Sequence, residues 1–127
     1  MKHIKNLLIP AFHTVNLMLI IFYLYSGSLS GCFIYNNCNT QPQITRDFII
    51  SSNHFYAFTI LFILGTFAYK GTKKIKFLIL YLILLSIILE LFHYIIPNRG
   101  FQISDLFGNI VGVVFVIIIY KVKDKYV

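Results

Sequence analysis

The stretch FLILYLILLSIILELFHYII, residues 77–96, decides what kind of protein this chain forms. All of its twenty residues are Ile, Leu, Phe or Tyr except Ser86, Glu90 and His93. A helix of about 20 apolar residues is long enough to cross the hydrocarbon core of a bilayer. No polar stripe of helical period divides the stretch, so the segment suits a lipid environment better than the surface of a water-soluble domain.

Three more apolar segments flank this stretch, and the composition of the whole chain agrees with them. The 127 residues are 58% hydrophobic and 12% charged, whereas about one quarter of the residues of a soluble domain are charged. We therefore predict an all-α integral membrane bundle of four transmembrane helices that forms a single domain over residues 1–127. The predicted helices cover about residues 7–25, 50–69, 77–96 and 104–120.

The lysines predict the orientation of this bundle. In a four-pass arrangement they all fall on one side, and only Arg46 and Arg99 fall on the other. Positively charged loops stay in the cytoplasm, so we expect cytoplasmic N- and C-termini. The net charge of +7 does not indicate nucleic-acid binding, because the basic residues form no single patch. The lysines concerned are Lys2, Lys5, Lys70, Lys73, Lys74, Lys76, Lys121, Lys123 and Lys125.

The loop after the first apolar segment leaves two alternatives open. Residues 29–32, Leu-Ser-Gly-Cys, match the lipobox of bacterial lipoprotein signals, and cleavage there would leave an acylated Cys32 and three spans. Against this, the preceding apolar stretch is longer than the apolar h-region of a signal peptide, which has about 7–15 residues. This difference favours a retained helix. Cys32 and Cys38 either form a disulfide in an oxidising compartment or remain free thiols.

Polar residues within the apolar segments indicate a site, because a charge inside a membrane is costly. Glu90 lies about two turns from the outer end of its helix, and His93 follows on nearly the same face. On the predicted topology, six residues from three helices and one loop share the outer half of the membrane. They are His54, Glu90, His93, Arg99, Asp105 and Asn109.

These side chains suit general acid–base chemistry and the binding of an anionic group. We assign Glu90, His54 and Asp105 as catalytic candidates, and Arg99, His93 and Asn109 as substrate-binding candidates. Glu90-x-x-His93 also resembles half of a helical metal site that His54 and Asp105 would complete. This pattern is weak by itself, so the sequence leads us to expect no metal, and it leaves any cofactor undetermined.

A structural role is the alternative for several of these residues. Arg99 would then pair with Asp105, and Asn109 would form a hydrogen bond across helices. Gly108 and Gly112 form a small-x-x-x-small pair that lets another helix approach closely, either within the chain or in a homo-oligomer. His13 and Asn16 lie nearer the cytoplasm, where we expect polar contacts between helices rather than a part of the site.

The order of these residues over 51–121 resembles the VanZ-like family of small bacterial membrane proteins, named for one linked to resistance to the glycopeptide teicoplanin. The resemblance rests on His54-Phe55, Glu90-x-x-His93, Pro97-Asn98-Arg99, Ser104-Asp105 and Asn109-x-x-Gly112. The family usually has Gln at the position of His93, and often an Asp-Lys pair where this chain has Ile50 and Ser51.

The resemblance implies a role in the cell envelope. We expect the outward-facing site to bind or modify a lipid-linked or wall-related molecule, with membrane lipid and a lipid-linked envelope precursor as partners. Whether the chain is an enzyme stays open. The alternative is a non-enzymatic scaffold or subunit whose polar cluster is structural. Proton-coupled transport is a weaker third hypothesis, because four short helices leave little room for alternating access.

Overall fold

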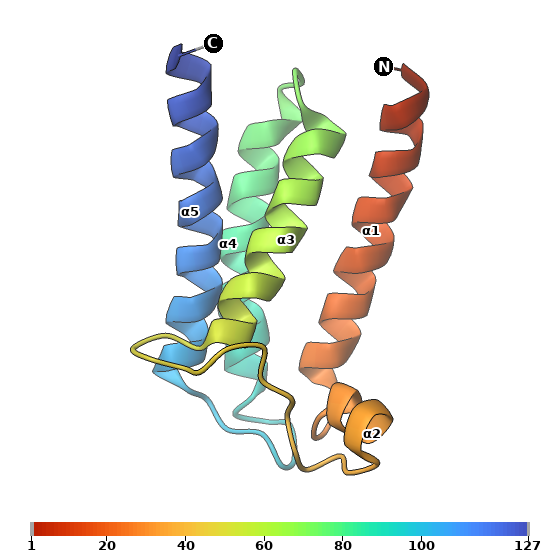
Figure 1. Cartoon of the computed structure of the whole chain (residues 1–127), viewed down its shortest axis with the longest axis vertical. Helices are drawn as coiled ribbons and strands as arrows, with labels where there is room; N and C mark the ends of the chain where they lie inside the picture. The colour runs from red at the N-terminus through yellow and green to blue at the C-terminus, as the bar shows by residue number, and fades with distance from the viewer. Residues whose placement is uncertain (1, 127) are drawn as a thin grey trace.

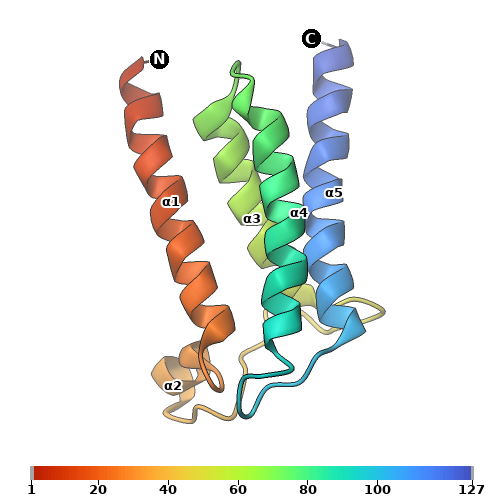
Figure 2. The same cartoon turned by 180° about the vertical axis from the view of Figure 1, so that it is seen from behind.

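The computed structural model describes the backbone of residues 2–126 and the side chains of residues 4–123. Within that range the chain forms five α-helices and no strand, so the all-α prediction is confirmed. The four long helices run side by side along one axis, and the short α2 lies at one end of the bundle (Figures 1 and 2). The helices are α1 (Lys2–Leu24), α2 (Leu29–Tyr35), α3 (Ser52–Tyr69), α4 (Lys74–Phe92) and α5 (Ile103–Tyr126).

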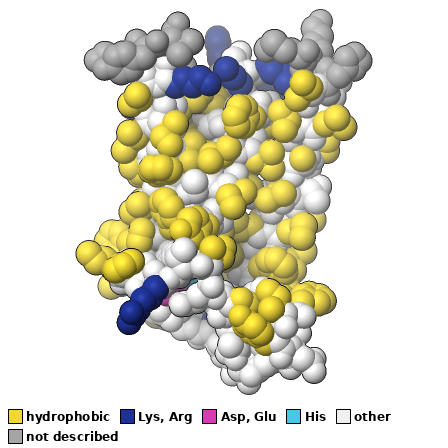
Figure 3. Space-filling view, viewed as in Figure 1, with side chains coloured by type: hydrophobic (Ala, Val, Ile, Leu, Met, Phe, Trp, Pro, Cys, Tyr) yellow, Lys and Arg dark blue, Asp and Glu magenta, His cyan; other side chains and the backbone are white. Residues whose placement is uncertain are grey.

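The two ends of the bundle differ in their charge. Both termini and the α3–α4 turn lie at the same end, which we call the lysine end (Figure 1). Lysine side chains follow this rim, and hydrophobic side chains cover the middle of the face shown in Figure 3. The opposite end, which we call the loop end, carries the connections 25–51 and 93–102. The side chains of Lys2 and Lys125 lie outside the described ones.

Three helices are long and apolar enough to cross a membrane. The segments are Ile4–Leu24, Lys74–Phe92 and Ile103–Lys123, with mean hydropathies of 2.0, 2.5 and 2.2. The fourth predicted span, α3, is not among these candidates, because its 18 residues begin with the polar Ser52, Asn53 and His54. The coarser conclusion, a helical membrane protein with at least three candidate spans, is supported.

Although it is not one of these three candidate spans, α3 is the centre of the bundle. It packs most extensively against α5, then α1, then α4, whereas α1 and α4 touch only slightly. Phe58, Leu61 and Phe62 of α3 are buried in the common core. Large apolar side chains such as Leu7 and Phe77 stay exposed on the outer faces. Soluble monomers rarely expose so much contiguous apolar surface, and lipid would cover it.

Gly108 and Gly112 provide the close approach that the sequence predicts, and they do so within the chain. A Cβ on Gly108 would lie 2.6 Å from the carbonyl oxygen of Ser51, and one on Gly112 would lie 2.7 Å from that of Phe55. The backbones of α3 and α5 therefore touch along this pair. Since α3 occupies the glycine face, a second copy of the chain has no access to it in this arrangement.

Several helix boundaries differ from the predicted ones because local hydrogen bonds set them. α3 begins at Ser52, whose N–H donates to Asp47 Oδ1 at 2.7 Å. α4 ends at Phe92 rather than near residue 96, and a series of turns follows. The first turn of α5 is closed by Gln102, whose carbonyl accepts from the N–H groups of Asp105 and Leu106.

The first connection is folded, and its helix α2 was not predicted. Ser28 caps α2 by accepting a hydrogen bond from the Gly31 N–H at 3.0 Å. A disulfide joins Cys32 to Cys38 and closes the loop behind the helix. The sulfur of Cys32 is therefore bonded within the chain and, in this state, is not free to carry a lipid.

The α3–α5 contact predicts how the bundle responds to added bulk. Gly112→Val places a branched side chain against the α3 backbone, so we expect a loss of about 1–3 kcal/mol of stability. The midpoint of thermal unfolding of the detergent-purified protein measures this loss. Gly100→Val is the matched control, because nothing lies within 4 Å of a Cβ at Gly100. Equal melting of both variants would contradict the contact.

Candidate functional site

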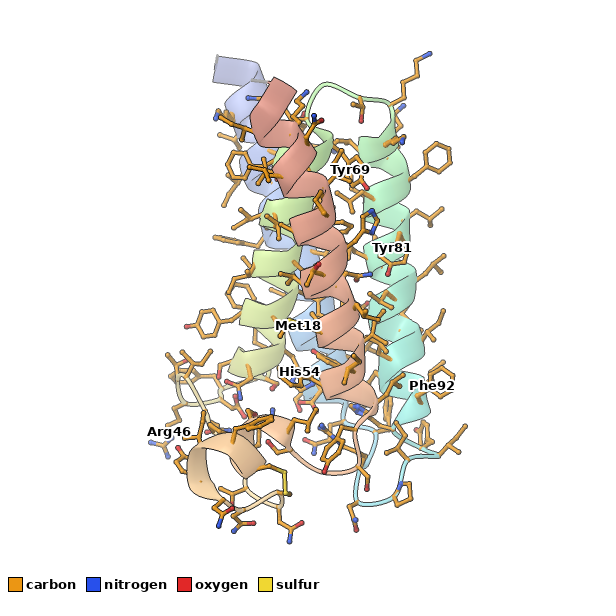
Figure 4. All side chains as sticks on the ribbon, turned by 90° about the vertical axis from the view of Figure 1, so that its right-hand side faces the viewer. Met18, Arg46, His54, Tyr69, Tyr81 and Phe92 are labelled. Carbon is orange, nitrogen blue, oxygen red and sulfur yellow. A yellow bond between two sulfur atoms is a disulfide. The ribbon has the colours of Figure 1, made fainter. Side chains whose placement is uncertain are left out.

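The polar residues predicted to share one depth do come together at the loop end of the bundle. His54 lies near the start of α3, Glu90 and His93 at the end of α4, and Asp105 and Asn109 in the first turns of α5. Glu90, His93 and Asn109 have at most 1% of their surface exposed. Figure 4 shows His54 near the loop end, with Tyr69 and Tyr81 further toward the lysine end.

Glu90 and His93 form a buried pair whose side chains face each other. His93 Nε2 lies 3.1 Å from the carbonyl oxygen of Tyr23, and because a carbonyl only accepts, Nε2 carries a hydrogen. His93 Nδ1 lies 3.2 Å from Glu90 Oε1. A hydrogen bond at this contact requires one more proton, either on the ring or on the carboxyl group. Oε1 also accepts the Gln102 N–H at 3.0 Å.

His54 and Asp105 form the second pair of a base and an acid. The Nδ1 atom of His54 lies 3.7 Å from Asp105 Oδ1 and 2.8 Å from the Ser51 hydroxyl. Ser51 is itself fixed, because its N–H donates to the carbonyl of Ser104 at the start of α5. The imidazole ring is thus oriented from its own helix and faces a carboxylate on the neighbouring one.

Tyr23 of α1 is the central residue that the sequence did not reveal. Its hydroxyl donates to Asn109 Oδ1 at 2.7 Å, so the predicted cross-helix contact of Asn109 exists. Its ring stacks on His93 with centroids 6.0 Å apart and meets His54 edge-on at 5.0 Å. Tyrosines are common near the ends of membrane helices, and therefore nothing in the sequence distinguished this one.

Arg99 reaches the site from the α4–α5 connection, but it does not pair with Asp105 among the described residues. Its Nε and one terminal nitrogen donate to the carbonyls of Tyr25 and Phe22, which lie at the C-terminal end of α1. Burial lowers the pKa of Arg99 from its ordinary value, and Asp105 and other nearby groups raise it. A guanidinium stays charged under such shifts, so Arg99 supplies a cation with unused N–H groups.

A cavity of about 370 Å³ opens beside these pairs. Tyr23, His54 and Arg99 line it together with Ser28, and its remaining wall is mostly apolar. The folded loop after α1 covers it from the loop end. The apolar residues that line the cavity are Phe22, Leu29, Ile34, Pro42, Ile44 and Ala57.

Two buried polar atoms of the site have no hydrogen-bond partner among residues 4–123. They are Glu90 Oε2, an acceptor, and Asn109 Nδ2, a donor. Such groups are rare in folded proteins and usually mark a ligand, an ion or water. Ligand-capable atoms of His54, Glu90 and Asp105 also lie within 4.8 Å of one another.

The polar residues nearer the lysine end lie outside this site, as predicted. His13 contacts the Tyr69 hydroxyl at 2.9 Å, and Asn16 donates to the Tyr81 hydroxyl at 2.6 Å. Both hydrogen bonds join α1 to a neighbouring helix, so they act as polar contacts between helices.

Comparison with known proteins identifies the kind of chain that carries this site. The family model described as VanZ/LLP1 matches residues 5–124. The match includes α1 and α2, which the motifs over 51–121 did not cover. Comparisons with curated proteins and with solved structures found no match.

The Tyr23 hydroxyl predicts a measurable contribution to stability. In Tyr23→Phe the ring stays, but the buried Asn109 amide loses its partner, which costs about 1–3 kcal/mol. We expect a lower unfolding midpoint in detergent. Tyr94→Phe is the control, because Tyr94 is exposed and its hydroxyl bonds to nothing among the described residues. If both variants melt like the parent protein, the hydrogen bond between Tyr23 and Asn109 is not significant.

Proposed function

We propose that this chain, which belongs to the VanZ/LLP1 family, is a cell-envelope membrane protein that binds or modifies a lipid-linked anionic molecule at its loop end. The observation that carries the proposal is the joint placement of two acid–base pairs and a free cation beside one covered cavity.

We propose the topology of the sequence analysis as the setting for this site. α3 crosses the bilayer with the other three long helices, because its polar first turn is shielded by α1 and α5 instead of facing lipid. The lysine end is cytoplasmic and the loop end faces outward, in a bacterial cytoplasmic membrane. The disulfide at the loop end agrees with an oxidising exterior.

The cavity supports an amphiphilic substrate with an anionic group. Its apolar wall suits a lipid chain, whereas Arg99 has N–H groups left for a phosphate or carboxylate. Asn109 Nδ2 is a further buried donor without an acceptor. A polyprenyl phosphate combines an apolar chain with a phosphate. Such lipids carry wall precursors at the outer face of the membrane.

The two pairs give this site the means to move a proton. Glu90 and His93 face each other in a buried contact of 3.2 Å, so a proton can pass between them with little rearrangement. His54 borders the cavity, and Asp105 lies behind its ring. We assign His54 as the group that faces the substrate, and Glu90 as the carboxylate on which activity depends.

The scaffold alternative rests on the hydrogen bonds that these residues make between elements. Gln102 to Glu90, Tyr23 to Asn109, and Arg99 to the end of α1 each tie two parts of the bundle together. If these bonds are the only role of the cluster, Glu90→Gln should lower the yield and melting point of the protein without a specific loss of binding.

A test of the proposed site compares Glu90→Gln with Asp47→Asn, an exposed carboxylate-to-amide change. Binding of a polyprenyl phosphate to the detergent-purified protein is measured by native mass spectrometry, and thermal unfolding is measured beside it. We expect Glu90→Gln to reduce binding at least tenfold at nearly unchanged melting, and Asp47→Asn to bind like the parent. Normal binding by Glu90→Gln would overturn the role of the carboxylate.

The link to teicoplanin is a separate part of the proposal and has its own test. Expression of the chain in a teicoplanin-sensitive Gram-positive host should raise the inhibitory concentration of teicoplanin, and Glu90→Gln should not raise it. An unchanged concentration with well-expressed parent protein would remove resistance from the function, while binding measured in vitro would stand.

The proposed orientation predicts which loops are labelled from outside the cell. In a background of Cys32→Ser and Cys38→Ser, a cysteine placed at Asn39 should react with a membrane-impermeant maleimide on intact cells. A cysteine placed at Thr72, in the α3–α4 turn, should react only after the cells are opened. The reverse pattern would invert the topology.

A further inference from the structure

We propose that His54, Glu90 and Asp105 hold a divalent first-row transition-metal ion of the Zn²⁺ or Mn²⁺ class. The three residues come from α3, α4 and α5, and one ligand-capable atom of each lies within 4.8 Å of the other two. The sequence did not lead us to expect a metal, because Glu90-x-x-His93 alone is weak. The folded chain brings Glu90 together with His54 and Asp105, the two residues named to complete that pattern, and these three make the set without His93.

The unsatisfied oxygen of Glu90 is an independent sign of a ligand. The residue is fully buried, and Oε1 already accepts the Gln102 N–H and faces His93. Oε2 has no partner among the described residues. A buried carboxylate oxygen without a donor is costly, and a bound cation would supply the missing interaction.

The donor set selects the class of ion. One imidazole and two carboxylates suit Zn²⁺ and Mn²⁺, whereas Mg²⁺ prefers oxygen ligands and retains much of its water. Metal–ligand distances of about 2.0–2.2 Å require ligand atoms roughly 3–4 Å apart. His54 Nδ1 and Asp105 Oδ1 are already 3.7 Å apart, and all three ligand atoms lie within 4.8 Å of one another, so the cluster must contract around an ion.

His54 binds an ion through Nδ1 only by giving up its contact with the Ser51 hydroxyl, which lies 2.8 Å from that atom. Glu90, by contrast, is already oriented by its neighbours. The Gln102 N–H and His93 hold the Glu90 carboxylate. Such outer contacts orient the ligands of most protein metal sites. Two carboxylates buried together would also repel each other, and a divalent ion neutralises both.

Three protein ligands leave at least one position open, as in catalytic rather than structural zinc sites. The site lies beside the cavity that His54 and Arg99 line. A phosphate oxygen of the lipid proposed above would fit the open position while Arg99 contacts the remaining oxygens. This last step rests on the proposed function, whereas metal binding by the three residues does not.

The experiment measures metal and lipid separately. Protein carrying a tag without histidines is purified in detergent, stripped with a chelator and dialysed against Zn²⁺ or Mn²⁺. We expect about one equivalent of metal per chain by elemental mass spectrometry, with no competition from Mg²⁺. His54→Gln, Glu90→Gln and Asp105→Asn should each weaken binding at least tenfold, whereas His13→Gln and Asp47→Asn should not.

A Co²⁺ spectrum of the parent protein tests metal binding even where a variant folds poorly. Nitrogen and oxygen ligands give Co²⁺ visible d–d bands without a thiolate charge-transfer band. Added Zn²⁺ should displace the Co²⁺ and abolish these bands. Less than one fifth of an equivalent of metal on the folded parent, or binding that survives all three substitutions, would overturn the site. Metal binding without polyprenyl phosphate binding would keep the site and reject the proposed substrate, and the converse result would reject only the metal.

Discussion

A carboxylate with no exposed surface is the constraint on which the loop end of this protein depends. Glu90 cannot be solvated, so the chain must bring donors to it. It receives one from His93, the residue after α4, and another from Gln102, the residue before α5. Both ends of the α4–α5 connection therefore contact the Glu90 side chain. These contacts set where α4 ends and where α5 begins.

Once α4 and α5 are fixed in this way, two different kinds of contact place the remaining helices. Gly108 and Gly112 let α3 lie directly against α5, which positions His54 over Asp105. α1 packs against α3 and is also attached to the bundle by hydrogen bonds along its length. Tyr23 binds Asn109 near the loop end, and His13 binds Tyr69 nearer the lysine end.

The sequence could predict those features that depend on depth in a membrane. Apolar length and lysine placement fix which helix ends lie level, so His54, Glu90, Asp105 and Asn109 could be grouped without any contact being known. It could not predict contacts made by irregular backbone. Arg99 binds the end of α1 instead of Asp105 because of how residues 93–102 turn, and no periodic pattern encodes that path.

α3 shows why hydropathy alone was an incomplete guide to this chain. The polar first turn that keeps α3 from being a candidate span contains His54, which borders the cavity. It also contains Asn53, whose side chain bonds to the backbone of the connection 25–51. A helix surrounded by three others can carry polar residues that a lipid-facing helix cannot, because the partners are protein groups at fixed positions. The polar first turn of α3 and its share of the site thus have one cause: this helix lies at the centre of the bundle, where protein groups surround His54.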